Sequence, residues 1–188
     1  MMYNIIALMG KAGAGKDALL RRIVAEEPNK FNEIISTTTR PARENEVQGK
    51  NYHFVSEDIF KNYIDDGLML EWTIFRDWYY GTSLNSLNSS AINIGVFNPT
   101  GVRTLMQLPT VKVTPIYVIA TDKTRIVRQM ERETNPNVKE ILRRYEADEK
   151  DFKDIEYTFN KLVLLNNENA ITDTVDTFFS LGQKNVNY

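Results

Sequence analysis

A glycine-rich turn near the start of the chain has the residue types and spacing of a phosphate-binding loop. Its sequence is Gly10-Lys11-Ala12-Gly13-Ala14-Gly15-Lys16-Asp17. The turn fits the pattern G-x-x-x-x-G-K. Glycines let the backbone curl so that successive N–H groups point at phosphate oxygens, and Lys16 adds a mobile cation. We therefore expect this loop to bind the phosphates of a nucleotide.

Asp17 stands where this pattern usually has Ser or Thr, whose hydroxyl ligates Mg²⁺. The next residue, Ala18, offers no replacement hydroxyl. Because carboxylate oxygen is a good magnesium ligand, Asp17 is a candidate to hold Mg²⁺, directly or through water. The alternative is that Asp17 is only a helix N-terminal acid that interacts favourably with the helix dipole.

The composition restricts the chemistry of the rest of the chain. The absence of cysteine excludes disulfides and thiolate metal sites, and a single histidine argues against histidine catalysis. A net charge of −2 gives no general attraction to nucleic acid or to an anionic membrane, so we expect neither as a partner. The opening residues lack a signal-peptide pattern and no apolar run is long enough to span a bilayer, which predicts a cytoplasmic protein.

Short apolar runs that alternate with helical patterns predict an α/β fold with a parallel sheet flanked by helices. Runs typical of buried strands lie at 3–9, 91–97, 113–120 and 162–165. Apolar residues at helical spacing lie at 19–24, 102–106 and 171–179.

Two segments interrupt this alternation. The first, 31–82, is rich in Thr, Arg, Tyr and Trp and is expected to form an inserted subdomain. Its short β-like pieces lie at 34–35, 52–55 and 69–72. The second, 124–154, contains the helix breaker Thr134-Asn135-Pro136-Asn137 and predicts a helical hairpin. We therefore expect a single domain, 1–188, with its core formed by 1–30, 83–123 and 155–188.

Three motifs follow the phosphate loop. The first is Ser36-Thr37-Thr38-Thr39-Arg40-Pro41-Ala42-Arg43-Glu44 with Val47-Gln48-Gly49-Lys50-Asn51-Tyr52-His53-Phe54-Val55-Ser56. The second is Leu70-Glu71-Trp72 and the third is Tyr79-Tyr80-Gly81-Thr82. Together with the loop they closely resemble guanylate kinase, over nearly the whole chain. The resemblance implies a P-loop NTPase core, a GMP-binding subdomain at 31–82 and a lid at 124–154.

The resemblance implies that four side chains hold the phosphate of GMP: Arg40, Arg43, Tyr52 and Tyr80. Two arginines three positions apart can present planar guanidinium groups to one phosphate, and phenols add hydrogen-bond donors. The alternative for each of these residues alone is a solvated basic loop with two core tyrosines.

Glu71 is the candidate that reads the base. Its carboxylate would accept hydrogen bonds from N1–H and the exocyclic amine of guanine, whereas adenine would present a bare N1 lone pair to it. The resemblance adds Ser36 and Thr82 as base contacts, and Asn98 is placed with GMP as well. The alternative is that Glu71 is an exposed carboxylate on a strand.

The resemblance weakens after the strand predicted at 91–97. Aligning Gly101 with the family's glycine places Val96 and Asn98 where guanylate kinases typically carry carboxylates. Asn98 can still hydrogen-bond a base or an arginine, but Val96 cannot orient a cation or metal-bound water. Either magnesium handling is rearranged, for instance with Asp17 supplying the lost carboxylate, or catalysis is reduced.

Arginines of the predicted hairpin supply further positive charge. Arg128, Arg132 and Arg144 resemble the family's lid arginines, and with Lys16 they are expected to stabilise the migrating phosphoryl group. The alternative is surface pairing with Glu131, Glu133 or Asp148. Arg125 and Arg143 are assigned to the solvated face of the hairpin.

These residues together predict an enzyme that transfers the γ-phosphate of ATP, bound with Mg²⁺, to GMP or dGMP, as a monomer or homodimer. Asn166, or its neighbour Asn167, follows the last strand where the family contacts adenine. Two alternatives stay open. The loop ending and Asn98 would suit a broader deoxynucleoside monophosphate kinase. The replacements at 17, 96 and 98 would suit a catalytically silent binding module.

Overall fold

A parallel five-stranded sheet forms the centre of the computed structural model, which describes residues 2–44, 46–132, 134–158, 162–165 and 174–180. The strands follow the order β2-β7-β1-β8-β9, and every neighbouring pair is parallel. Their bounds are β1 Tyr3–Met9, β2 Phe31–Glu33, β7 Ile92–Val96, β8 Val111–Ile119 and β9 Leu162–Leu165. The parallel α/β core expected from the sequence is therefore confirmed.

Helices cover both faces of this sheet, because alternate strand residues point to opposite sides. Leu8 of β1 joins a core cluster with α1, Lys16–Glu26, and with a helix at 174–180. Its neighbours Ala7 and Met9 join a second cluster with α3, Pro99–Met106, and α6, Ile155–Thr158. The phosphate loop, between β1 and α1, is thus anchored at both of its ends in apolar cores.

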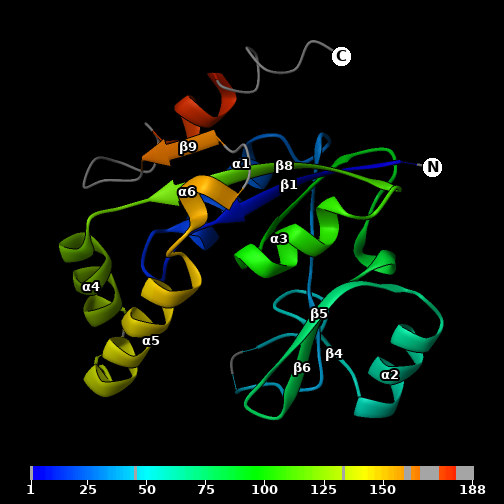
Figure 1. The fold of residues 1–188 in the computed structure, drawn as a ribbon, viewed down its shortest axis with the longest axis horizontal. Coiled ribbons are helices and arrows are strands. Elements are labelled where there is room, and N and C mark those ends of the chain that lie inside the picture. The colour runs from blue at the N-terminus through cyan, green and yellow to red at the C-terminus, as the bar shows by residue number, and fades with distance from the viewer. Residues whose placement is uncertain (1, 45, 133, 159–161, 166–173, 181–188) are drawn as a thin grey trace.

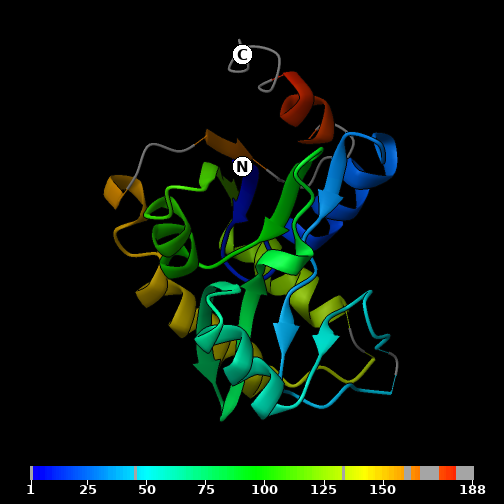
Figure 2. The same cartoon turned by 90° about the vertical axis from the view of Figure 1, so that its right-hand side faces the viewer.

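A second sheet lies below the first, on the same side of it as the helical hairpin (Figures 1 and 2). Its strands, in the order β4-β3-β6-β5, are β4 His53–Phe54, β3 Thr37–Thr38, β6 Trp78–Ser83 and β5 Met69–Phe75. The expected β-like piece at 34–35 lies outside these strands, since the buried Ile34 packs in the core cluster beside α3 instead. Likewise, β2 belongs to the main sheet, although the inserted segment was expected to begin at 31.

A helix that the sequence analysis did not anticipate, α2 Glu57–Asp65, packs against the second sheet. Its fully buried Phe60 lies 5.2 Å from the ring of Tyr79, measured between centroids. Ser56 caps the helix by accepting a hydrogen bond from the N–H of Ile59 at 3.3 Å. A short 3-10 helix at Leu84–Ser86 leads back to the main sheet.

The expected helical hairpin consists of α4, Asp122–Glu131, and α5, Val138–Asp151. Figure 1 shows the two helices side by side at the end of β8, facing the second sheet across the molecule. Among the described residues, no helix is long and apolar enough to cross a membrane.

Truncation of a core residue in the central strands is expected to destabilise the protein strongly. Ile94 of β7 is fully buried, so Ile94→Ala leaves a cavity and should lower the free energy of unfolding by about 2–5 kcal/mol in urea denaturation. The matched control is Ile74→Ala on β5, which is 53% exposed and should lose less than about 1 kcal/mol. Equal losses at the two positions would contradict this description of the core.

Candidate active site

The phosphate loop is wound tightly enough that two of its glycines have left-handed backbone angles. Gly13 has φ of 80° and Gly15, which precedes α1, has φ of 90°. A Cβ on Gly13 would lie 2.3 Å from the carbonyl oxygen of Arg125, so only glycine fits there. Lys16 donates from Nζ to the carbonyl oxygen of Gly10 at 2.6 Å, and burial lowers the pKa of its ammonium group. The loop therefore has the expected form, with the lysine folded over it.

Charged residues of the hairpin hold the tip of this loop. Arg125 is 2% exposed and donates from Nε to the carbonyl oxygen of Ala12 at 3.1 Å. Asp148 accepts a hydrogen bond from the N–H of Ala12 at 2.6 Å and another from Nη2 of Arg125 at 3.2 Å. Both polar groups of the Ala12 residue are thus bonded to side chains, one from α4 and one from α5.

The expectation that Arg125 lies on a solvated face is wrong. Its guanidinium is paired with other side chains instead of being solvated. Nη1 donates to Asp122 at 2.7 Å, and the centroid of the Tyr145 ring lies 5.2 Å from the guanidinium carbon. A reading of helical periodicity places an arginine on the solvent face, because the pattern does not show which residues of other helices it meets. Its partner Asp148 lies 23 residues further along the chain. Lys11 of the loop also pairs with Glu149 of α5. We call these contacts, between Lys11, Ala12, Arg125, Asp148 and Glu149, the loop clamp.

The residues expected to hold the acceptor phosphate gather on the second sheet and its loop. The guanidinium of Arg40 lies 5.5 Å from the ring of Tyr52, and the rings of Tyr52 and Tyr80 are 6.1 Å apart. Glu46, which the sequence analysis did not single out, accepts from Arg40 at 2.8 Å and from the backbone N–H of Arg43 at 2.9 Å. Burial raises the pKa of the Tyr52 phenol, which stays a hydrogen-bond donor at neutral pH.

Glu71, on β5, lies beside Thr82 of β6. Its Oε1 accepts a hydrogen bond from the hydroxyl of the buried Thr82 at 2.7 Å, and burial raises the pKa of its carboxyl group. A Cβ on Gly101, in the first turn of α3, would lie 3.0 Å from Oε2 of Glu71. Glu71 is therefore packed against the main sheet's helix and is not an exposed strand carboxylate.

A small cavity of about 160 Å³ collects most of the predicted GMP contacts. It is lined by residues that include Ser36, Tyr52, Glu71, Tyr80, Val96 and Asn98. Val96 ends β7 and Asn98 lies two residues further on, so this end of the strand closes the cavity from the main sheet. Five of the residues predicted from the sequence to contact GMP therefore lie around one cavity, although they come from two sheets.

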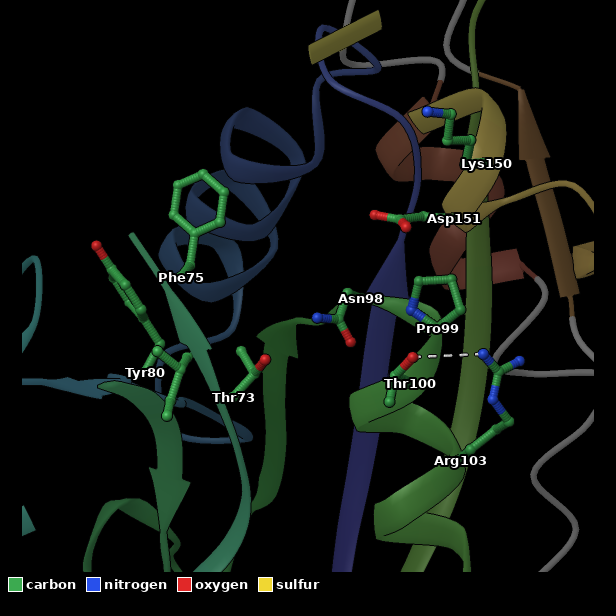
Figure 3. Close-up of a pocket in the computed structure, with 10 residues that line it drawn as sticks. Thr73, Phe75, Tyr80, Asn98, Pro99, Thr100, Arg103, Lys150 and Asp151 are labelled. Carbon is green, nitrogen blue, oxygen red and sulfur yellow. Dashed lines mark hydrogen bonds between the residues drawn. The ribbon is translucent and has the colours of Figure 1, made fainter. Parts of the chain in front are cut away.

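A larger cavity of about 660 Å³ adjoins the first and shares Thr73, Tyr80 and Asn98 with it. Figure 3 shows its walls, which come from three parts of the chain: Thr73, Phe75 and Tyr80 of the second sheet, Asn98, Pro99, Thr100 and Arg103 at the start of α3, and Lys150 and Asp151 at the end of α5. Lys150 directly follows Asp148 and Glu149 of the loop clamp. The second sheet, the start of α3 and the end of α5 therefore border two adjoining cavities.

The hairpin arginines have different positions. Arg128 reaches the carbonyl oxygen of Gly13 from Nη1 at 3.5 Å, whereas Arg132 lies exposed at the end of α4. Arg144 donates to Glu140 at 3.0 Å, a surface pair with a different acid from the Glu131, Glu133 or Asp148 that the alternative named. Asn166 lies outside the described residues.

Glu140 joins the hairpin to the second sheet. It accepts hydrogen bonds from Arg143 at 2.8 Å and from Arg76, in the β5–β6 turn, at 2.9 Å. These arginines, with Arg143 the largest influence, hold the pKa of the Glu140 carboxyl far below its usual value. Arg143 is exposed, as expected, and stacks 5.6 Å from the ring of Phe75. The contacts bring the hairpin to one side of the larger cavity.

The residues near the loop suit a magnesium ion that arrives with a nucleotide. Asp17 is exposed in the first turn of α1, and no described residue forms a hydrogen bond or ion pair with its carboxylate. Mg²⁺ commonly takes one or two carboxylates together with substrate phosphates and water. Among the described residues, no cluster of three or more His, Asp or Glu side chains could hold an ion by itself.

Comparison with known proteins agrees with this geometry. The family model described as guanylate kinase matches residues 2–180. The chain belongs to the guanylate kinase family. The resemblance read from the sequence is thereby confirmed, and with it the ATP-dependent kinase activity that acts on GMP.

Several guanylate kinases are similar to this chain over different lengths. That of Sulfurimonas denitrificans is 33% identical over 155 residues, which are 80% of this chain and 68% of that protein. That of Helicobacter pylori is 47% identical over 81 residues, 43% of this chain and 39% of that protein. The crystal structure of guanylate kinase from Anaplasma phagocytophilum covers all of this chain and 88% of its own, with a TM-score of 0.64 and 16% identity. This last likeness supports the fold alone.

Breaking the loop clamp is expected to cost much more stability than breaking an exposed pair. Arg125→Met leaves the half-buried Asp148 without its cation and should lower the free energy of unfolding by about 3 kcal/mol in urea denaturation. The control, Arg22→Met, removes an exposed pair with Glu26 on α1 and should cost less than about 1 kcal/mol.

The same experiment includes Asp148→Asn and the double variant. Because the two side chains are hydrogen-bonded, the double variant should lose less than the sum of the single losses. Additive losses, or an Arg125→Met variant no less stable than Arg22→Met, would show that the clamp contributes nothing to the fold.

Proposed function

We propose that this guanylate kinase transfers the γ-phosphate of ATP to GMP or dGMP within the cleft between the phosphate loop, the second sheet and the hairpin. The observation that carries the proposal is the shared boundary of the two cavities. Tyr80 and Asn98 line both the small cavity around Glu71 and the large one, whose lining also includes Lys150, the residue that follows Glu149 of the loop clamp. Two nucleotides bound in these places would present their phosphates to one another.

On the ATP side, the loop amides from Gly10 to Asp17 would hold the phosphates, with Lys16 as the mobile cation. The lowered pKa of Lys16 comes mainly from burial, and the nearby Asp17 and Asp148 charges oppose that shift. An arriving phosphate would offset the same burial cost by pairing with the ammonium group. Asp17 would hold Mg²⁺ with the phosphate oxygens, where the ion neutralises charge.

On the acceptor side, Arg40, Arg43, Tyr52 and Tyr80 would hold the phosphate of GMP, while Glu71, Ser36, Thr82 and Asn98 would contact the base. Glu46 has a positioning role, since it is bonded to Arg40 and to the backbone of Arg43. Arg40 also lies over the Tyr52 ring, which fixes the plane of its guanidinium. The acceptor phosphate is already a nucleophile at neutral pH, so no protein general base is needed.

Arg128, Arg132 and Arg144 would stabilise the charge on the migrating phosphoryl group when the second sheet closes over the nucleotides toward the hairpin. Arg128 already contacts the loop, whereas Arg144 would have to exchange Glu140 for phosphate. Closure around both nucleotides would also exclude water and so prevent hydrolysis of ATP. A cytoplasmic location and a monomer or homodimer stay predictions.

The direct test is ADP formation from ATP in the presence of GMP or dGMP, followed in a coupled assay. Lys16→Met should lower kcat by roughly 10²-fold or more, because an electrostatic contact to the transferring phosphate is lost. Lys112→Met, on the exposed part of β8, is the control for removal of a lysine and should leave the rate unchanged. No ADP with either acceptor, at any magnesium concentration, would overturn the proposal.

The affinity for GMP should depend on pH, because the proposed base contact needs the Glu71 carboxyl group in its ionised form. Because burial raises its pKa, the carboxylate takes up a proton at a higher pH than an exposed glutamate does. Affinity for GMP should therefore fall as pH is lowered through this raised pKa, and should be full above it.

Calorimetric titration of GMP at several pH values measures this effect in the wild type and in Glu71→Gln. Glutamine cannot ionise, so the variant reports only the titration of the GMP phosphate itself. The difference between the two curves belongs to Glu71. Identical pH dependence in both proteins would mean that the Glu71 carboxylate does not read the base.

A further inference from the structure

Glu140 of the hairpin is bonded to two parts of the molecule that Figure 1 shows as separate. Its Oε1 accepts a hydrogen bond from Nε of Arg144, within the hairpin, at 3.0 Å. Its Oε2 accepts one from Nη2 of Arg76, in the second sheet, at 2.9 Å. Arg143 donates to both oxygens, at 2.9 Å to Oε1 and at 2.8 Å to Oε2. One carboxylate therefore holds an arginine predicted to act on phosphate and also holds the second sheet.

A tight turn presents Arg76 to the hairpin. Phe75 and Trp78 pair across the ends of β5 and β6, and two residues, Arg76 and Asp77, connect them. Both connecting residues have left-handed backbone angles, with φ of 50° and 65°. Two left-handed residues in succession form the compact turn that commonly closes a β-hairpin. Arg76 therefore lies at the tip of a narrow projection of the second sheet.

The ring of Phe75 adds a second contact between the same two parts. The guanidinium carbon of Arg143 lies 5.6 Å from the ring centroid, and that of Arg76 lies 5.4 Å from it. Guanidinium groups are attracted to the faces of aromatic rings, so both contacts are favourable. Phe75 also lines the large cavity. We call Phe75, Arg76, Glu140 and Arg143 the latch, because they join the second sheet to the hairpin beside that cavity.

The charges around Glu140 do not balance while Arg144 is paired with it. Three guanidinium groups then surround one carboxylate, and like charges repel one another. Repulsion between Arg76 and Arg144 weakens the hold of Glu140 on the second sheet. When Arg144 leaves for a phosphate, Oε2 keeps both of its donors and the carboxylate faces one cation fewer. The attraction between Glu140 and Arg76 then becomes stronger.

We infer that the latch couples the two substrates: ATP draws Arg144 away from Glu140, which then holds Arg76, and with it the second sheet, more tightly over the acceptor. Glu140 and Arg76 are positioning residues, since they act through Arg144 and through the second sheet. The inference rests on the proposed function, which assigns Arg144 to the migrating phosphoryl group. Because coupling between two sites is reciprocal, GMP must raise the affinity for ATP by the same factor.

Calorimetric titration of GMP, with and without the non-hydrolysable imido analogue of ATP and Mg²⁺, measures this coupling. In the wild type the analogue should tighten GMP binding by about fivefold or more. Arg76→Gly removes the guanidinium, so the coupling factor should fall to about twofold or less. Glu140→Gln keeps the size of the side chain without its charge and should give the same loss. The double variant should lose no more, because both residues act through one contact.

Arg144→Met separates the exchange of Arg144 from a passive tether. In this variant Glu140 is free of Arg144 from the start, so the latch is at full strength without a nucleotide at the loop. GMP alone should therefore bind about as tightly as it binds to the wild type with the analogue present, and the analogue should add little. GMP binding that is no tighter than in the wild type without the analogue would contradict the exchange.

The matched control is Asp77→Gly, which makes the same change at the neighbouring position of the turn. Glycine adopts left-handed angles readily, so both glycine variants should fold, and thermal unfolding checks this. Asp77→Gly should keep the coupling factor of the wild type. The Arg76 side chain is 60% exposed, so about 1 M NaCl should screen its pair with Glu140 and remove most of the difference between the wild type and Arg76→Gly.

Two outcomes would overturn the inference and leave the proposed function intact. One is GMP binding with an unchanged coupling factor in Arg76→Gly or Glu140→Gln, or with no coupling in the wild type. The other is an equal loss in Asp77→Gly, since the shape of the turn and not the latch would then be responsible. If the wild type does not bind GMP at all, the proposed function fails, and the coupling that depends on it fails as well.

Discussion

The arrangement of the site depends on how the Ala12 residue of the phosphate loop is held. Its N–H is bonded to Asp148 and its carbonyl oxygen to Arg125, and these two side chains also bond each other. A guanidinium that is almost fully buried is tolerated only while its charge partners stay in place. The loop, α4 and α5 are therefore tied into one unit, and that unit fixes where the donor phosphates would lie relative to the cleft.

The acceptor side is constrained differently, through stacking and burial rather than through a buried ion pair. Arg40 is held between Glu46 and the Tyr52 ring, and Glu71 is held by Thr82 against the first turn of α3. Glu71 lines the small cavity, and the contacts of both residues restrict the rotation of their side chains. Preorganised groups of this kind lose little entropy when a ligand binds, which favours both affinity and discrimination between bases.

Much of this could be predicted from the sequence, because the decisive signals were local. The loop glycines, the apolar runs of β1 and β7, and the motif around Glu71 each lie within a few residues. The rest depended on tertiary contacts. Burial of Arg125 requires Asp148 from another helix, and periodicity places any arginine in solvent. The helix α2 was missed although Ser56 followed by Glu57 and Asp58 is a start signal, since the neighbouring β-like pieces dominated the interpretation.

The central claim is that the loop and Glu71 face a single cleft in which two nucleotides lie phosphate to phosphate. The most direct measurement is the dissociation constant of a bisubstrate compound, adenosine and guanosine joined through a pentaphosphate, compared with those of ATP and GMP. If both sites share the cleft, joining the ligands should tighten binding over either nucleotide by roughly 10²-fold or more. A compound that binds no more tightly than ATP alone, and that leaves the affinity for GMP unchanged, would contradict the account.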